Sequence, residues 1–262
     1  MSTSGFYSWC EREQSARSLE DAELLKRITR IYDKSKGRYG SPRVYKALKN
    51  QGFNLGKKRV ERLMRHAGLV ARCVKVCRRM PKLKNFKKAG TNLLLNMSKP
   101  TDINQVWVGD ITYLKVNGKW QYLATVMDLY SRRILSWSLS KDRRTSLTIK
   151  VLRSALKKRK VDGNLIFHSD RGIEYLGYAF REELKVNLIR QSFNRAGHCT
   201  DNAFMESFYH SLKGELIRRS VYKTTKALKQ ALSAYINGFY NRVRLHSGID
   251  YLSPIEYEQR VA

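Results

Sequence analysis

Hydrophobic residues recur at helical spacing in three stretches of the first 70 residues, and each stretch predicts a short amphipathic helix. The second predicted helix begins at Ser41-Pro42, where a serine N-cap would precede a proline in the first turn, and it ends before Gly52. The third is stopped by Gly68. The predicted buried stripes are Leu24, Leu25, Ile28, Ile31 and Tyr32, then Val44, Ala47 and Leu48, and finally Val60, Leu63, Met64 and Ala67.

After residue 100 the hydrophobic pattern changes from a helical period to the alternation of strands. Three antiparallel strands are predicted at 105–116, 119–129 and 132–140, with Asn117-Gly118 as the hairpin turn between the first two. Helices at 145–160 and 178–185 then alternate with short strands at 164–169 and 187–193, before a final helical region. This order predicts an α/β domain built on a mixed sheet.

The charge balance narrows the class of partner. The 262 residues include 52 lysines and arginines against 22 aspartates and glutamates, a formal net charge of +30. Ordinary metabolic enzymes need no such excess, so the expected partner is a polyanion, with nucleic acid first. Between positions 71 and 99 there are nine basic residues and no acid. We interpret residues 71–100 as a basic linker between two folded units, either solvated or lying along DNA phosphates.

The second and third predicted helices, joined by a tight glycine turn, form a helix-turn-helix candidate. The third helix carries a basic surface, whose residues we predict to contact DNA. An ordinary helical bundle with a solvated basic face is the alternative, and the net charge of the chain favours DNA. The predicted contacts are Lys57, Lys58, Arg59, Arg62 and Arg65.

Several other classes of protein are not supported. No apolar run approaches the roughly 20 residues of a membrane-spanning helix, and residues 1–14 lack the basic and apolar regions of a secretory signal. The cysteines have neither the number nor the spacing of a disulfide framework or a zinc site. We therefore expect a cytoplasmic protein with reduced thiols at Cys10, Cys73, Cys77 and Cys199.

Three acidic residues occupy informative positions in the second unit. Asp110 interrupts an apolar strand, where an uncompensated charge would be costly to bury. Asp170 follows the fourth strand, a common position for ligand-binding groups. Glu206 lies on a predicted helix, opposite its apolar stripe. That stripe is predicted to contain Phe204, Met205, Phe208, Leu212 and Leu216, with Asn202, Glu206 and Lys213 on the other side.

Carboxylates that converge from a central strand, a neighbouring strand end and a helix are suited to divalent cations. Mg²⁺ prefers oxygen ligands, and two ions roughly 3.5–4 Å apart can activate an attacking oxygen and stabilise a leaving one at phosphorus. Each acid alone could instead form a salt bridge or a surface charge. Together, in so basic a protein, the three predict a metal-dependent site for phosphodiesters.

The motifs around these acids are Trp107-x-x-Asp110-Ile111-Thr112-Tyr113, His168-Ser169-Asp170-Arg171-Gly172 with Tyr175, and Asp201-Asn202-Ala203 with Glu206-Ser207-Phe208 and Lys213. Further matches extend across nearly the whole chain, at Arg38-Tyr39-Gly40, Arg62-Leu63-Met64, Tyr240-Asn241, Arg244, His246-Ser247 and Ser253-Pro254. With 35 residues between Asp170 and Glu206, the chain resembles the DDE transposases of bacterial insertion sequences, relatives of retroviral integrases, and specifically their downstream-frame (OrfB) product.

The resemblance implies a ribonuclease H-like core, with a mixed five-stranded sheet flanked by helices, after a small all-α helix-turn-helix module. It implies that Asp110, Asp170 and Glu206 are catalytic and hold two Mg²⁺ or Mn²⁺ ions. An activated water would then cleave at the element's end, and the freed 3′-hydroxyl would attack a second phosphodiester. Glu174 stands where the family usually carries glutamine.

Further basic residues are expected at the DNA around the carboxylates. These are Arg171, Arg190 and Arg195, for which ordinary surface charge is the alternative, and Lys213 as a contact to the substrate phosphate. A zinc site formed from His168, His198, Cys199 and His210 is disfavoured because their spacing is irregular.

The expected division of the chain is an N-terminal extension at 1–18, the helical module at 19–70, the linker at 71–100, the core at 101–220 and a helical extension at 221–262. The resemblance implies double-stranded DNA partners, at element ends and target, a homo-oligomer on DNA, an upstream-frame product as fusion or partner, no membrane, and a place in the bacterial cytoplasm or nucleoid. A DNA-binding regulator without chemistry and a structure-selective nuclease are the competing functions.

Overall fold

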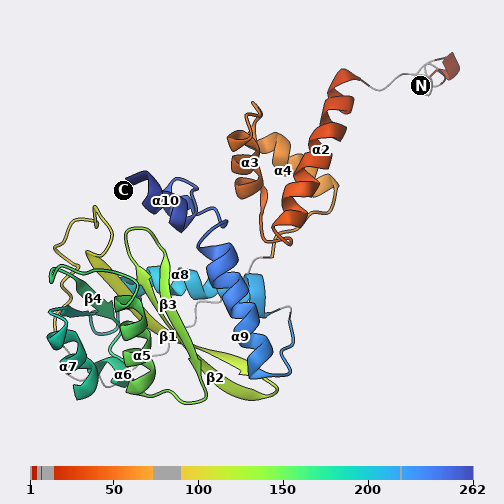
Figure 1. Cartoon of the computed structure of the whole chain (residues 1–262). Coiled ribbons are helices and arrows are strands. Elements are labelled where there is room, and N and C mark those ends of the chain that lie inside the picture. The colour runs from red at the N-terminus through yellow and green to blue at the C-terminus, as the bar shows by residue number, and fades with distance from the viewer. Residues whose placement is uncertain (1, 5–6, 8–14, 73–89, 219, 262) are drawn as a thin grey trace. The chain divides into compact units, whose positions relative to one another are not determined.

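The computed structural model describes residues 2–4, 7, 15–72, 90–218 and 220–261 of the chain (Figure 1). The chain forms two compact units that divide between residues 73 and 74. Most of the predicted linker, residues 73–89, lies outside the described residues, as do Cys10, Cys73 and Cys77.

Within residues 15–72 of the described chain, the N-terminal unit contains three helices that pack on one another, as predicted. Helix α2 begins inside the expected N-terminal extension, at Ala16, because the Ser15 hydroxyl accepts the N–H of Ser18 at 3.2 Å. The helices are α2 (Ala16–Lys34), α3 (Ser41–Asn50) and α4 (Lys57–His66). Their buried apolar side chains are Leu24, Ile28, Val44, Leu48, Val60, Leu63 and Met64.

Glycines define the start of α3 and the end of α4. The predicted N-cap of α3 is wrong by one residue: Gly40 occupies that position, and its carbonyl accepts the N–H groups of Arg43 and Val44. After α4, Gly68 adopts a φ of 64°, as the predicted stop requires. The N–H of Leu69 can therefore bond back to the α4 carbonyls, which ends the helix.

The second unit is built on a mixed five-stranded sheet with the order β3-β2-β1-β4-β5, which confirms the predicted architecture. The first three strands are antiparallel neighbours, while β4 runs parallel to both β1 and β5. The strands are β1 (Val106–Val116), β2 (Lys119–Asp128), β3 (Ile134–Ser140), β4 (Ile166–Ser169) and β5 (Arg190–Phe193).

The turn before β3 is longer than the sequence pattern indicates. The Asp128 carboxylate accepts the N–H groups of Tyr130 and Ser131, at 3.0 and 3.1 Å, which holds a tight turn. Arg132 has a φ of 62°, outside the range of a strand. The strand therefore starts at Ile134 and not at Arg132.

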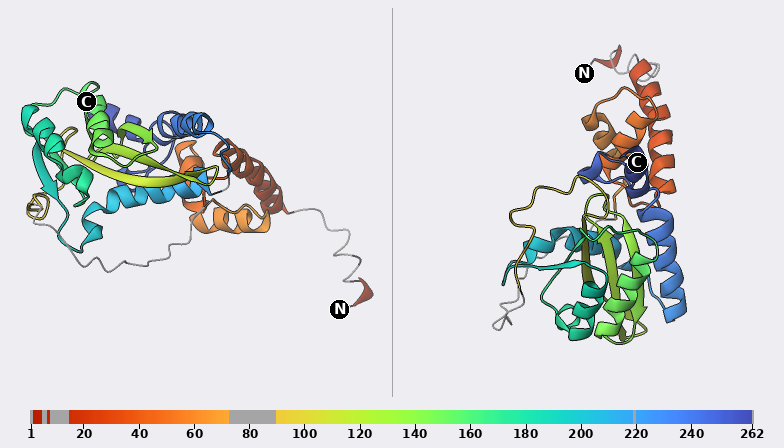
Figure 2. Two further views of the ribbon diagram at one scale, coloured as in Figure 1. Left: turned by 90° about the horizontal axis from the view of Figure 1, so that it is seen from below. Right: turned by 60° about the vertical axis from the view of Figure 1, so that its left-hand side comes forward.

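Helices cover the two faces of the sheet. Figure 2 shows α8 (Ala203–Leu212) on the opposite face from α5 (Thr145–Leu156). On the α5 side, α6 (Ile173–Leu176), which the sequence pattern does not predict, and α7 (Tyr178–Val186) complete the layer (Figure 1). The apolar core between this layer and the sheet includes Trp107, Val151, Leu152, Phe167, Phe180 and Leu184.

The chain continues from α8 into the C-terminal helices. A π-helical turn, η2 (Lys213–Ile217), follows α8 directly, and α9 (Thr225–Ser233), η3 (Ala234–Tyr240), η4 (Ser247–Ile249) and α10 (Pro254–Val261) come after it. In the part of the chain that the structure describes, no helix combines the length and apolar character needed to cross a membrane.

Buried polar bonds fix this C-terminal segment to the core. The Arg244 guanidinium contacts the Glu215 carboxylate of η2, with 2.8 Å between Nη2 and Oε1, and both side chains are almost fully buried. Tyr235 donates its hydroxyl hydrogen to the same carboxylate at 2.8 Å. Asn241 exchanges two hydrogen bonds with the backbone of Ile134, at the start of β3. The segment is therefore anchored to both the edge strand and the helix that carries Glu206.

Candidate active site

Strand pairing brings Asp110 and Asp170 together. β1 and β4 are parallel, and their last paired residues are Gly109 and Ser169. Asp110 directly follows Gly109, and Asp170 directly follows Ser169. Neighbouring strands lie about 4.8 Å apart. Gly109 permits this approach, since a Cβ there would lie 2.5 Å from the ring of Phe167. Both carboxyl groups therefore lie at the same edge of the sheet, half-buried.

The electrostatic surroundings of Asp110 are strongly unfavourable to its charge. Burial, followed by the charge of Asp170, raises its pKa to about 8, and Glu206 contributes in the same direction. The N–H of Ile111 and the charge of Arg143 offset this only in part. Burial also raises the pKa of Asp170. Asp110 is thus close enough to both Asp170 and Glu206 to be repelled by their charges.

Glu206 lies in the first turn of α8 and is exposed, as predicted. The predicted apolar stripe of this helix is partly wrong. Phe204 is 40% exposed and stacks on the Arg132 guanidinium at 3.8 Å, while Asn202, expected on the outer side, is buried. The stripe is completed instead by Tyr209, which donates its hydroxyl hydrogen to the Asp110 carbonyl at 2.6 Å. That bond joins the α8 helix to β1 at Asp110.

The donor set fits a hard divalent cation in its chemistry. All three side chains offer carboxylate oxygens, the ligands that Mg²⁺ and Mn²⁺ prefer. The mutual repulsion at Asp110 is the kind that a bound cation would relieve. Among the described residues, no three His, Cys, Asp or Glu side chains are already gathered closely enough to enclose an ion.

Glu174, which replaces the usual glutamine, is buried and paired. Its carboxylate contacts the Arg143 guanidinium, with 2.6 Å between Oε1 and Nε, and is itself 2% exposed. A Cβ on Gly172 would lie within 3 Å of oxygens from both Glu174 and Asp170, so the two carboxylates are neighbours. The positive charge of Arg143 lowers the pKa of both Asp110 and Asp170, while its guanidinium pairs with Glu174. Nothing in the sequence pattern of Arg143 distinguishes it from other surface arginines.

His168 is a structural residue of the strand that carries Asp170. Its ring is fully buried, with Nδ1 2.9 Å from the Ser192 hydroxyl and Nε2 2.7 Å from the Asn194 amide oxygen. Since both nitrogens are engaged, the ring is not available to a metal. These bonds tie β4 to β5 beside the carboxylates.

The predicted arginine contacts occupy different environments. Arg171 donates to the Asn194 carbonyl at 2.7 Å, which holds two loops together. Arg195 is paired with Asp201, with 2.9 Å between Nη2 and Oδ1. Arg190 pairs with Ile166 at the start of β4, a strand length from Asp170. The structure therefore places Arg171 directly after Asp170, Arg195 in the loop that follows β5, and Arg190 at the start of β5, far from Asp170.

Lys213 lies beside the carboxylates. It begins η2, one element after Glu206, and the charge of Asp110 acts on it. Its Nζ lies 4.8 Å from the ring centre of Tyr113 on β1. Burial lowers its pKa, and within the described residues no ion pair neutralises it.

The predicted DNA contacts of the helical module fall into two groups. Lys57 and Lys58 are exposed in the first turn of α4. Arg59 and Arg62 both pair with Asp21 of α2, the first with 2.6 Å between Nε and Oδ1, while Arg65 lies 3.9 Å from Glu61. Two of the five cations thus also hold α4 against α2.

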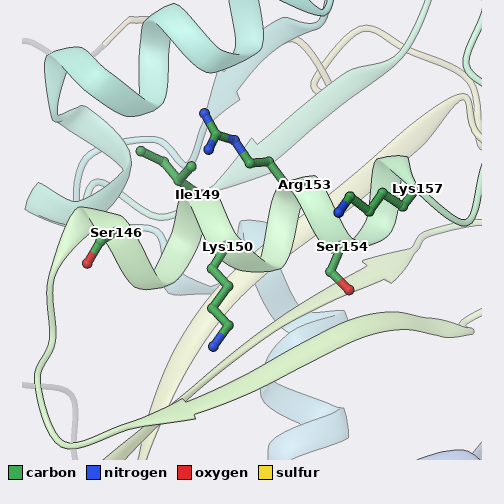
Figure 3. Close-up of a pocket in the computed structure, with 6 residues that line it drawn as sticks. All are labelled: Ser146, Ile149, Lys150, Arg153, Ser154 and Lys157. Carbon is green, nitrogen blue, oxygen red and sulfur yellow. The ribbon is translucent and has the colours of Figure 1, made fainter.

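An open hollow lies on the outward face of α5, as Figure 3 shows. It is lined by residues of that helix and by Lys157 directly after it, and none of the predicted site residues contributes to it. Arg153 points out of it toward α7 and pairs with Glu183 at 2.6 Å. The lining residues are Ser146, Ile149, Lys150, Arg153, Ser154 and Lys157.

Comparison with known proteins defines the class. Residues 100–199 match a family model described as "Integrase core domain", residues 206–261 match a second model of that description, and residues 18–76 match an "HTH-like domain". The fold and these matches define a polynucleotidyl-transferase enzyme with an integrase core that follows a helix-turn-helix-like domain.

Relatives narrow the class to a family. The chain is 36% identical over 263 residues to "Transposase InsF for insertion sequence IS3A" of Escherichia coli (strain K12), covering 98% of this chain and 90% of that protein. It is 35% identical over 253 residues to "Transposase for insertion sequence element IS904" of Lactococcus lactis subsp. lactis (strain IL1403), covering 95% and 98%. The chain belongs to the DDE-type transposases of bacterial insertion sequences.

Some solved structures are more distantly similar to this chain. One is the "HTLV-2 integrase catalytic core domain in complex with magnesium (trimeric form)", at 17% identity and a TM-score of 0.43, covering 60% of this chain and 98% of that one.

Proposed function

We propose that this transposase cleaves DNA at the ends of an insertion sequence and joins the freed 3′ end to target DNA, in a reaction that requires divalent cations. The observation that carries the proposal is the electrostatic coupling of Asp110 to both Asp170 and Glu206. A carboxylate that is repelled by two others, in a protein of net charge +30, is suited to bring cations and phosphates together.

The proposed ligands of the cations are Asp110, Asp170 and Glu206, and the number of ions we propose is two, Mg²⁺ or Mn²⁺. When bound, two such ions supply activation of the attacking oxygen and stabilisation of the leaving oxygen. The HTLV-2 core with magnesium is consistent with this choice of ion. The oxygen-only donor set of this chain supports it independently.

The residues of the chain then have distinct parts in the reaction. Asp110 must lose its proton to act as a ligand, which its raised pKa opposes unless a cation is bound. Glu206, on the exposed side of α8, faces solvent, where DNA has access. Lys213 is a candidate contact to the substrate phosphate, because it lies near Asp110 without an ion pair among the described residues.

The proposed partner is double-stranded DNA, both as element ends and as target. Lys57 and Lys58 are exposed, and among the described residues neither forms an ion pair. Bringing two element ends together requires at least two copies of the chain, so we propose a homo-oligomer on DNA. A fusion to an upstream-frame product remains part of the proposal for the full activity.

A strand-joining assay tests the proposed function. Labelled DNA that carries the element's ends is incubated with the wild-type chain, Asp110→Asn, Glu206→Gln and the control Asp162→Asn, which alters an exposed acid away from the site. The wild-type chain is expected to form joined products only with Mg²⁺ or Mn²⁺. Of the three variants, Asp162→Asn alone should retain this activity. Cleavage without joining would favour a nuclease, and bound DNA without any product would favour a regulator.

A further inference from the structure

Two large aromatic side chains are exposed on the β1–β2 hairpin. Tyr113 is 57% exposed and Trp120 is 51% exposed, and their rings meet edge to face with 5.1 Å between centroids. Exposed aromatic surface of this size costs free energy in water, and such a pair is a frequent feature of binding surfaces.

Two lysines frame this pair. Nζ of Lys115 lies 5.4 Å from the ring centre of Trp120, and Nζ of Lys213 lies 4.8 Å from that of Tyr113. Within the described residues neither lysine has a carboxylate partner. We call Tyr113, Lys115, Trp120 and Lys213 the aromatic platform. It combines rings that can stack with cations that can contact phosphates, the pairing that single-stranded nucleic acid requires.

The topology of the sheet sets the platform beside the open edge of β1, across the strand from Asp110. Tyr113 and Lys115 lie on one face of β1 by strand alternation, the face opposite to that of Asp110, and Trp120 joins them because it pairs with Lys115. The last pair of β1 with β4 is Gly109 and Ser169, so residues 110–116 have an open edge on that side. Lys213 begins η2 on the other face of the sheet, and its Nζ lies close to the ring of Tyr113. The charge of Asp110 also acts on it, in the direction that raises the pKa of Lys213.

The distance suits one particular occupant. Tyr113 is three residues beyond Asp110 on an extended strand, about 10 Å along it. Stacked nucleotides rise about 3.4 Å each along one strand, so the same length spans about three nucleotide steps. A DNA strand whose phosphate lies at the carboxylates, and which passes round the open edge of β1 to its other face, thus has a base within reach of the two rings.

We propose that the aromatic platform stacks on an unpaired base of the DNA strand held at the carboxylates, while Lys115 and Lys213 contact the neighbouring phosphates. This inference rests on the proposed function, since it places the scissile phosphate at Asp110 and Asp170. It assigns Tyr113 and Trp120 a preference for DNA with single-stranded character next to the reacting bond.

Binding measured in chelator tests the platform without any chemistry. The probes are a blunt duplex and the same duplex with a short single-stranded extension that carries 2-aminopurine, whose fluorescence changes on stacking. The wild-type chain is expected to bind the extended duplex more tightly. Trp120→Ala and Tyr113→Ala should each reduce this preference at least about fivefold, the effect of one lost stacking contact.

Control variants separate stacking from charge and from folding. Trp120→Phe keeps a ring and should keep most of the preference. Lys115→Ala should weaken binding to both duplexes equally and reduce the slope of log affinity against log salt concentration by about one. Tyr178→Ala removes another exposed tyrosine, 79% exposed on α7, and should change nothing. Thermal melts of each variant establish that the core remains folded.

The outcomes distinguish this inference from the proposed function. An unchanged preference in folded Trp120→Ala and Tyr113→Ala, or self-association that these variants abolish while the DNA preference persists, would overturn the platform. Loss of the preference in both variants supports the platform even if no joined product forms in the strand-joining assay. Joined products together with an unaffected preference would leave the proposed function intact and remove the platform.

Discussion

The Arg143 guanidinium forms an ion pair with the carboxylate of Glu174, with 2.6 Å between Nε and Oε1, directly beside Asp170. Arg143→Met would leave a buried carboxylate unpaired next to another, so the free energy of unfolding should fall by about 1–3 kcal/mol. Chemical denaturation measures this. In the double variant with Glu174→Gln most of the loss should be recovered, since no buried charge remains. A single variant as stable as the wild type would show that the pair has no structural role.

The raised pKa of Asp110 predicts a pH dependence of stability in the metal-free protein. The folded state keeps the proton that the unfolded state releases, so stability is full below the ordinary value of 3.8 and is lost as the pH rises to about 8. Asp110→Asn still accepts the Ile111 N–H but carries no charge. Above pH 8 this variant should therefore be more stable than the wild type by a few kcal/mol, at about 1.4 kcal/mol for each pKa unit.

Thermal melts across this pH range, with and without Mg²⁺, measure the effect at Asp110. Added Mg²⁺ should stabilise the wild-type chain most at high pH and should have little effect on Asp110→Asn. Equal melting temperatures of the two proteins at every pH would contradict the assignment of a destabilising buried charge.

The buried pair of Arg244 and Glu215 should matter more than an exposed pair of the same chemistry. Arg244 is 4% exposed, and its removal as Arg244→Met leaves Glu215 buried with only Tyr235 as a partner, at a cost of about 3–5 kcal/mol. The matched control is Arg153→Met, where the guanidinium pairs with Glu183 at the surface and its loss should be minor. Urea denaturation measures the free energy of unfolding of both variants. Similar losses of stability in the two would rule out the anchoring role of Arg244.

In the helical module, Lys57→Ala and Lys58→Ala should weaken DNA binding without loss of stability, because both side chains are exposed. Each should also lower the slope of affinity against salt by about one. Lys150→Ala, on the outward face of α5, serves as the control. Fluorescence anisotropy at several salt concentrations measures the slopes. An effect of Lys150→Ala as large as that of Lys57→Ala would mean that net charge alone determines binding.

Much of the fold could be predicted because periodicity reports burial directly. The alternation in residues 106–116 and the Asn117-Gly118 turn predict the hairpin that carries Asp110. Strand order along the chain then brings Asp170 to the same edge. The errors arise where the local pattern is ambiguous. Phe204 is apolar yet 40% exposed, because its ring packs on the Arg132 guanidinium and not in the core. Tyr209 has a polar hydroxyl yet is buried, because that hydroxyl donates to the Asp110 carbonyl.

The surroundings of the site were less predictable because they depend on contacts between distant segments. Arg143 and Glu174 are 31 positions apart, and only the packed structure shows that they form a pair. Similarly, the basic character of Arg195 suggests a phosphate contact, but the structure pairs it with Asp201. Charge can be counted from a sequence, whereas its compensation depends on the fold.

The most direct test of the central claim is to locate Mn²⁺ by anomalous X-ray scattering in crystals of the full chain. The ion is expected between the carboxylates of Asp110 and Asp170, with Glu206 nearby, and it should be absent from crystals of Asp110→Asn. Mn²⁺ bound only elsewhere, or bound at these carboxylates equally well in Asp110→Asn, would contradict the claim that Asp110, Asp170 and Glu206 form the metal-dependent centre.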